Sequence, residues 1–301
     1  MSSKYAVLGA ILVLPVPMSA QTGSLAPPKT NDMFGTWSPD GKQIAFVSDR
    51  TSDAEVFVAN VDGSGTRQLT SVPGRDAHPS WHPDGSLLFQ SPREGGHTRI
   101  FRMNRDGRDQ RSLAPTTGFC GVPFASPDGK RIAFQCSASS KDFGTPAAPW
   151  RIYLLEKGRP AVRVVTKGPG NDQVPAWSPD GRKLMFFSDR GGANQLYELT
   201  LSSGAVRQLT RGPAEHSSAS YSPDGKRIAV MRAEPGRKGD VYVLGPGSKL
   251  VRVTRSEPQF GTAIFSPNGR NLLIQLPTPG GWRLHVAPAD GSGEPKAIEF
   301  R

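Results

Sequence analysis

The chain has 301 residues, of which 36% are hydrophobic and 21% are charged, and it contains 34 Gly and 28 Pro. Gly and Pro together stay below the roughly 25–30% that is typical of disorder, and this share of turn formers favours an all-β fold. The net charge of +11 suits anionic partners. No basic run, zinc finger or aromatic RNA-binding motif accompanies the charge, so we expect no nucleic-acid partner.

Residues 1–20 have the pattern of a secretory signal peptide. Lys4 gives a basic start, Tyr5 to Val16 is apolar, and the segment ends on the small residue Ala20. The apolar run is too short for a helix to cross a bilayer core of roughly 30 Å. Residues 21–30 follow as a short tether. We therefore predict a periplasmic or secreted protein with no transmembrane segment after cleavage, an uncleaved anchor being the alternative.

The remaining chain, residues 31–301, repeats one turn sequence six times. Ser-Pro-Asp-Gly or a close variant begins at Ser38, His82, Ser126, Ser178, Ser222 and Ser266. The spacing is 44 residues, except for 52 between the third and fourth copies. A period near 44 residues is typical of the four-stranded blades of a β-propeller.

Each copy predicts the same local structure. Pro fixes φ at the second turn position and Gly accepts the left-handed conformation, so the turn joins two antiparallel strands as a three-residue hairpin loop. An aromatic residue precedes the turn in five copies, and alternating apolar residues follow it. Two further short strands complete the unit. We predict a six-bladed β-propeller of four-stranded antiparallel blades at about 31–70, 75–114, 119–166, 171–210, 215–254 and 259–301.

The strand directions define two faces. The turn mouth carries the six Ser-Pro-Asp-Gly turns, and the loop mouth carries the loops after each second strand and between blades. Loop-mouth segments differ in length and chemistry, and the extra residues of the longest repeat fall between Ser139 and Pro149. Binding residues concentrate on variable loops of a rigid scaffold, so we expect function at the loop mouth. The turn mouth holds an excess of Lys and Arg, which suits solvation or weak attraction to an anionic envelope.

One repeat position places six residues near the channel at the loop mouth. They are Asp32, Asp76, Cys120, Asp172, His216 and Phe260. Asp32, Asp76, Asp172 and His216 are candidate ligand-binding residues, able to hold a cation or a basic segment of a partner. The alternative is structural, because Arg50 and Arg190 end the second strands of their blades and can pair with Asp32 and Asp172.

Cys120 and Cys136 are candidates for a disulfide. Counting outward from a hairpin closed by Ser126 and Lys130 places Cys120 directly opposite Cys136. Cross-strand Cβ atoms lie about 4.5–5.5 Å apart, near the distance that a disulfide needs, and export permits oxidation. Two reduced core thiols are the alternative.

The repeat resembles that of the periplasmic TolB family, which reads roughly D-x-x-P-x-W-S-P-D-G-K-x-I-A-F-x-S-x-R. Asp172 to Arg190 follows this pattern, as do Asp32 to Arg50 and Asp76 to Phe89. The resemblance implies the propeller fold and says little about function. Full TolB proteins carry an α/β domain before the propeller, and only the tether precedes it here.

The sequence shows no catalytic residues, no metal ligands in a recognised spacing and no G-x-S-x-G hydrolase elbow. We predict an exported, monomeric, non-enzymatic module that binds a protein or peptide of the cell envelope and needs no cofactor. One alternative is a metal-dependent propeller enzyme of the lyase or lactonase type, with a divalent cation in the channel. Another is a module that binds a glycan or the envelope.

Overall fold

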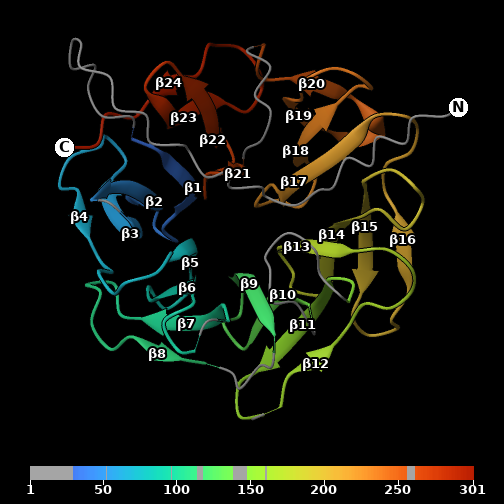
Figure 1. The fold of residues 1–301 in the computed structure, drawn as a ribbon. Coiled ribbons are helices and arrows are strands. Elements are labelled where there is room, and N and C mark those ends of the chain that lie inside the picture. The colour runs from blue at the N-terminus through green and yellow to red at the C-terminus, as the bar shows by residue number, and fades with distance from the viewer. Residues whose placement is uncertain are drawn as a thin grey trace, which may run out of the picture.

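The computed structural model describes residues 30–51, 53–95, 97–113, 118–137, 148–159, 161–255 and 262–301. They form six four-stranded antiparallel sheets arranged in a ring around a central channel (Figure 1). The predicted fold class is therefore confirmed. The expected signal peptide and tether, Phe260 and most of the long third-blade loop lie outside the described residues.

The strands follow one another from the channel to the rim in every blade. Blade 1 contains β1 (Asp32–Trp37), β2 (Gln43–Thr51), β3 (Asp53–Asn60) and β4 (Arg67–Gln68). Blade 2 contains β5 (Ala77–Trp81), β6 (Leu87–Ser91), β7 (Arg99–Met103) and β8 (Arg111–Ser112). Blade 3 contains β9 (Phe119–Ala125), β10 (Arg131–Ser137), β11 (Arg151–Glu156) and β12 (Arg163–Val164).

Blade 4 contains β13 (Asp172–Trp177), β14 (Lys183–Ser188), β15 (Gln195–Thr200) and β16 (Val206–Gln208). Blade 5 contains β17 (Glu215–Tyr221), β18 (Ile228–Ala233), β19 (Asp240–Leu244), the single 3₁₀ turn Pro246–Ser248 and β20 (Leu250–Arg252). Blade 6 contains β21 (Ala263–Phe265), β22 (Asn271–Thr278), β23 (Gly281–Pro288) and β24 (Lys296–Ala297). No helix in the described part of the chain is long and apolar enough to cross a membrane.

The Ser-Pro-Asp-Gly turns are one residue longer than the sequence analysis predicted. In blade 3 the closing backbone hydrogen bond runs from Ser126 to the carbonyl of Arg131, not Lys130, at 2.8 Å. The Ser126 hydroxyl explains the change, because it donates to Asp128 and accepts the Arg131 amide. Gly129 adopts φ +67°, as predicted for this position.

Tryptophans at the ends of the first strands join blades 1, 2 and 4 to the blades before them. The indole nitrogens of Trp37, Trp81 and Trp177 donate to the carbonyls of Ile264, Thr36 and Phe124, respectively. Each of these tryptophans is at most 9% exposed. Burial of an indole with its N–H satisfied stabilises the contact between blades through both apolar area and a hydrogen bond.

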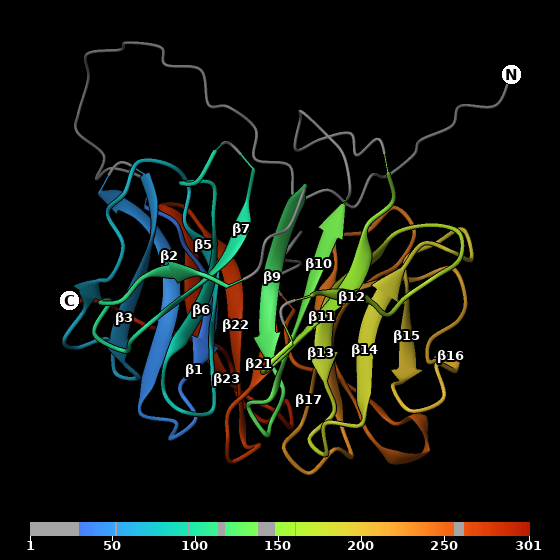
Figure 2. The ribbon, with the colours of Figure 1, turned by 90° about the horizontal axis from the view of Figure 1, so that it is seen from below.

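The ring closes without a strand shared between its ends. Blade 6 supplies all four strands of its own sheet, and so does blade 1. Backbone hydrogen bonds join Arg301 to Gly63 at 2.9 Å and Thr66 to Arg301 at 3.0 Å. The Phe300 ring stacks on Phe46 with 3.9 Å between ring centroids. Closure therefore rests on packing and on hydrogen bonds, both at the rim and between β1 and blade 6, which lie side by side in both views (Figures 1 and 2).

Five of the innermost strands contain a bulge near the loop mouth. Phe34, His78, Val122, Val174 and Ser218 stand at the same repeat position, and all have positive φ, between 43° and 55°. Such values are rare for residues other than glycine, and β-branched valines are the least suited to them. A glutamine of the preceding blade holds three of these amides: Gln275 accepts from Phe34, Gln90 from Val122 and Gln135 from Val174.

In four blades, a threonine after the fourth strand caps the third strand. The hydroxyls of Thr70, Thr166, Thr210 and Thr254 each accept a backbone N–H from the start of the third strand, at 2.9–3.0 Å. These fourth strands end two residues before the threonine, because its side chain takes the place of the next bond of the ladder. This cap lies at the loop mouth, immediately before the loop to the next blade.

Candidate functional site

Three of the predicted site residues occupy equivalent places at the starts of the innermost strands. Asp32, Asp76 and Asp172 are 3%, 1% and 0% exposed. The arginine that follows the second strand of the same blade pairs with each carboxylate. Arg50 lies 2.8 Å from Asp32, Arg190 lies 2.5 Å from Asp172, and Arg93 pairs with Asp76.

Each of these arginines has further partners within its own blade. The Arg190 Nε donates to the Ser188 hydroxyl at 3.1 Å, and its guanidinium lies 5.1 Å from the centroid of the Tyr197 ring. Arg50 and Arg93 repeat both contacts with their own serine and aromatic neighbours. The arrangement matches the structural interpretation, in which the acids brace the blades.

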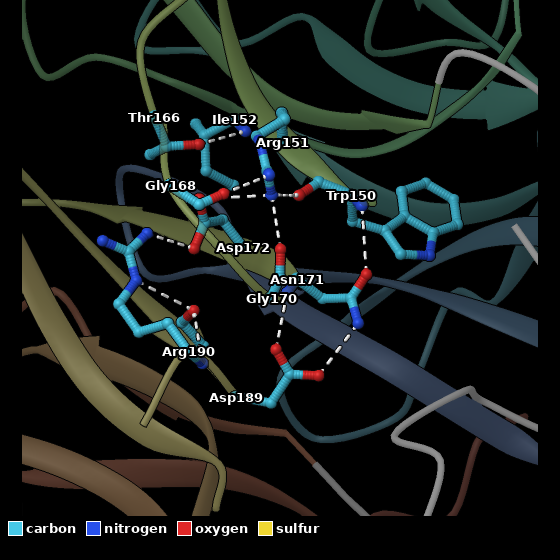
Figure 3. Close-up of polar contacts among 11 residues, drawn as sticks. Trp150, Arg151, Ile152, Thr166, Gly168, Gly170, Asn171, Asp172, Asp189 and Arg190 are labelled. Atoms are coloured by element: carbon cyan, nitrogen blue, oxygen red, sulfur yellow. Dashed lines mark hydrogen bonds and ion pairs between the residues drawn. The ribbon is translucent and has the colours of Figure 1, made fainter. Parts of the chain in front are cut away.

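A second layer of contacts ties neighbouring blades together at the loop mouth (Figure 3). Arg151 of blade 3 lies 3.8 Å from Asp172 of blade 4. Beside it, Asp189 accepts hydrogen bonds from the backbone and side-chain nitrogens of Asn171, at 2.6 and 2.9 Å. Asn171 in turn accepts the Trp150 amide at 3.1 Å. These bonds fix the loop between blades 3 and 4.

The equivalent positions in blades 3 and 5 hold uncharged groups. His216 is 4% exposed, and among the described residues its Nδ1 has no hydrogen-bond partner. Burial lowers the pKa of His216 to about 4, and the charge of Arg232 adds to the effect. A neutral imidazole is therefore the form present at neutral pH. The described residues contain no group of three or more His, Cys, Asp and Glu side chains placed to hold a metal ion.

Cys120 fills the position in blade 3. It pairs in register with Cys136 across β9 and β10, and the structure joins the two sulfurs in a disulfide. The pairing of Cys120 with Cys136 is the predicted one, but it results from two differences from the predicted hairpin that cancel each other. The hairpin is one residue longer than predicted, and the bulge at Val122 shifts the register back by one residue.

The bulges bring an aromatic pair to the loop-mouth end of the channel. The rings of Phe34 and His78 lie 4.1 Å apart, and both side chains stay partly exposed on neighbouring innermost strands. Arg75 precedes this pair in the loop between blades 1 and 2. Burial lowers the pKa of His78 to about 3, and the Arg75 charge acts in the same direction.

Arg75 is a partly buried cation with little negative charge available to it among the described residues. Burial lowers its pKa, and the nearby Asp49 opposes this shift. Both Asp49 carboxylate oxygens already accept hydrogen bonds from Asn31. Within the described residues, Arg75 makes no hydrogen bond or ion pair. Sequence analysis missed this cluster, although a proline follows His78 and also the bulges at Val122 and Val174. Proline within a strand pattern marks such irregularities.

A cavity of about 340 Å³ lies at the opposite, turn-mouth end of the channel. Trp37, Trp81, Phe124 and Phe265 line it, together with prolines of the turns. The two indole N–H groups are already bonded to backbone carbonyls. Part of the positive charge at the turn mouth is engaged in contacts between blades. Arg131 and Arg227 each donate a hydrogen bond to the carbonyl of the turn glycine in the next blade.

Comparison with known proteins agrees with this architecture. The family model described as the TolB β-propeller domain matches residues 19–140 and 106–299. The chain belongs to this family. The Tol-Pal system protein TolB of Bordetella pertussis is 40% identical over 52 residues, which cover 17% of this chain and 12% of that protein. The TolB of Anaeromyxobacter dehalogenans is 43% identical over 49 residues, 16% of this chain and 11% of that protein.

Solved structures extend the similarity of this TolB-like propeller to most of the described chain. TolB from Acinetobacter baumannii has a TM-score of 0.71 at 22% identity, covering 86% of this chain and 66% of that one. An oligogalacturonate lyase in complex with manganese has a TM-score of 0.62 at 15% identity, covering 87% and 91%. At such identities the similarity shows the fold alone. The matched segment spans only 12% of the Bordetella pertussis TolB, and the structural similarity spans 66% of the Acinetobacter baumannii TolB chain.

Proposed function

We propose that this TolB-like propeller is an exported, non-enzymatic module of the cell envelope that binds a protein or peptide at its loop mouth. The observation that carries the proposal is the Phe34–His78 ring pair beside Arg75, a desolvated cation without a partner in the described part of the chain. The cluster combines apolar surface with a single positive charge at the entrance of a channel.

This combination suits a peptide segment that presents a carboxylate next to an apolar side chain. Taking an arginine out of water is unfavourable until an anion satisfies it, so a ligand carboxylate gains a charge-assisted hydrogen bond there. The rings of Phe34 and His78, tilted by 39° to each other, offer apolar surface for an apolar or aromatic side chain. The innermost strands that carry the cluster form a rigid scaffold.

The braced acids support binding rather than metal-dependent chemistry. Asp32, Asp76 and Asp172 each hold an arginine, and such an arginine competes with any cation for the same oxygens. A stoichiometric divalent ion in the purified protein, lost on Asp172→Ala with the fold intact, would favour the lyase-like alternative. Envelope binding that weakens as salt rises and depends on the turn-mouth lysines would favour the glycan or envelope alternative.

A pull-down from envelope extract tests the proposal. Arg75→Ala is expected to lower recovery of the bound partner about tenfold or more, because a hydrogen bond to a charged group contributes about 1.5–3 kcal/mol. Arg211→Ala is the matched control, since Arg211 is an exposed arginine in another inter-blade loop of the same mouth. Lys226→Ala probes the turn mouth. Equal recovery with wild type and Arg75→Ala, or loss with Lys226→Ala alone, would contradict the proposal.

A further inference from the structure

In three blades, one repeat position supplies a side chain that donates hydrogen bonds to the inter-blade loop, the first residue before the third-strand amide that the threonine cap or its equivalent faces. In blade 3 this residue is Arg151, which precedes Ile152, and the Ile152 amide bonds to Thr166 (Figure 3). The Arg151 guanidinium donates to the carbonyls of Gly168 and Gly170, both at 2.5 Å. These hydrogen bonds from blade 3 thus hold the loop that leads to blade 4 in place.

The same position carries a donor in two further blades. In blade 4, the amide nitrogen of Gln195 donates to the carbonyls of Gly212 and Ala214, at 3.2 and 2.8 Å. In blade 6, Arg283 donates to the carbonyl of Thr30, which precedes blade 1. Side chains that differ in charge and length thus supply the same group, an N–H directed at the loop carbonyls.

Blade 1 has Glu55 at this position. The Thr70 hydroxyl donates to Glu55 Oε2 at 2.5 Å, just as the Thr210 hydroxyl donates to Gln195 Oε1 at 2.7 Å. The equivalence places the second oxygen of Glu55 where Gln195 has its amide nitrogen. Glu55 is only 4% exposed. An ionised carboxylate has only acceptors to offer there, whereas a protonated carboxyl has one donor.

Glu55 also lacks the countercharge that the carboxylate of blade 5 receives. Asp240 stands at the equivalent position of that blade, and Arg252 donates to it at 2.5 Å. In blade 1 the residue equivalent to Arg252 is the uncharged Gln68, whose amide donates to the Thr70 carbonyl at 2.7 Å. The Arg252–Asp240 ion pair therefore has no counterpart at Glu55 within the described residues.

The charges that surround Glu55 favour its neutral form. Burial raises the pKa of Glu55, and the hydrogen bond that Thr70 donates lowers it in part; the charges of Asp76 and Asp53 raise it further, while Arg93 opposes them. The donors of Arg93 are engaged with Asp76, Gln110 and Ser91. Burial raises the pKa of the neighbouring Asp76 as well, and its buried Oδ1 has no hydrogen-bond partner within the described residues. Two buried carboxyls thus share one arginine, which leaves one negative charge without compensation.

We propose that Glu55 is protonated in the folded protein and that this proton latches the loop between blades 1 and 2. The carboxyl O–H of Glu55 then takes the role of the Arg151 and Gln195 nitrogens. Loss of the proton at rising pH removes the donor and adds a charge beside Asp76. The loop that carries Arg75 loosens as a result. The latch does not depend on any ligand at the loop mouth, so the experiments that test it are independent of the proposed function.

Thermal unfolding across about pH 5 to pH 8 tests the latch with Glu55→Gln, which copies blade 4. Folding raises the pKa of Glu55, so the protonated carboxyl stabilises the folded protein fully below the ordinary Glu pKa. This stabilisation is lost as pH rises through the pKa of the folded state. The midpoint of Glu55→Gln should therefore rise relative to wild type with pH, by about 3 °C for each unit of that shift. Gln195→Glu should introduce the same loss into blade 4.

Hydrogen exchange gives a local measurement of the same event. The Asp76 amide bonds to the Ala54 carbonyl at 2.9 Å, and the equivalent His216 amide bonds to Asn194 at 2.8 Å. The protection factor of the Asp76 amide should fall as pH rises in wild type, but not in Glu55→Gln. The His216 amide, beside Gln195, is the internal control.

Parallel pH profiles for wild type and Glu55→Gln would overturn the latch. So would a lower midpoint of Glu55→Gln at every pH, because Glu55 would then act as an ionised acceptor. If calcium raises the midpoint of wild type at neutral pH but not that of Glu55→Gln, the carboxyl pair holds a metal ion and the proton assignment is wrong.

Discussion

Asp172 offers the sharpest test of whether the buried acids brace the blades or serve a ligand. The carboxylate is fully buried, lies 2.5 Å from Arg190 of its own blade and lies 3.8 Å from Arg151 of the preceding blade. Asp172→Ala leaves both guanidinium groups without their anion in a largely buried site. Breaking a buried ion pair by removing one partner typically costs about 3–5 kcal/mol.

This loss should lower the thermal midpoint by roughly 6–10 °C, taking about 2 °C per kcal/mol for a domain of this size. Differential scanning calorimetry measures the midpoint directly, with Asp62→Asn as the control because Asp62 lies on the exposed rim. A ligand-binding role without bracing predicts the opposite pattern, in which partner recovery falls and the midpoint is unchanged. A midpoint of Asp172→Ala within about 2 °C of wild type would refute the bracing interpretation.

Two further predictions concern blades 3 and 5. Iodoacetamide should label neither Cys120 nor Cys136 before reduction and both after it. Reduction should lower the free energy of unfolding by about 3 kcal/mol, as for a loop of similar length. Labelling of the unreduced native protein would exclude the bond. Folding depresses the pKa of His216 to about 4, so the neutral imidazole stabilises the folded protein fully above the ordinary His pKa. This stabilisation, up to about 3 kcal/mol, is lost as pH falls through the pKa of the folded state. The variant His216→Gln should lack this acid-side loss, and an unchanged acid limb of the unfolding profile would show that His216 does not cause it.

The six blades could be predicted from sequence because their turns are local. Proline, aspartate and glycine fix the backbone within four residues, so each Ser-Pro-Asp-Gly copy marks a hairpin wherever it stands. The positions of Arg50 and Arg190 relative to Asp32 and Asp172 follow from the strand directions alone. These pairs were accordingly foreseen as one of two interpretations, and the structure shows both ion pairs.

The bulges could not be predicted in this way, because they depend on a neighbouring blade. The left-handed conformation of Val174 is held by Gln135, which lies 39 residues earlier in the chain. The cluster of Phe34, His78 and Arg75 arises from such bulges, and the proline after His78 indicates only an irregular strand, not which side chains meet there. The cavity at the turn mouth was missed for the same reason, since four blades contribute to its wall.

The closure of the ring without a shared strand has a consequence for how the chain can be connected. The contact between blades 6 and 1 uses the same kinds of bond as the other contacts between blades, an indole donor at Trp37 and a glutamine acceptor at Gln275. The order of the blades in space therefore does not require the polypeptide to start at blade 1. A circularly permuted gene that joins residue 301 to residue 30 through a short linker and opens the chain at another inter-blade loop should encode the same propeller. Blades could likewise be exchanged or duplicated as units during evolution.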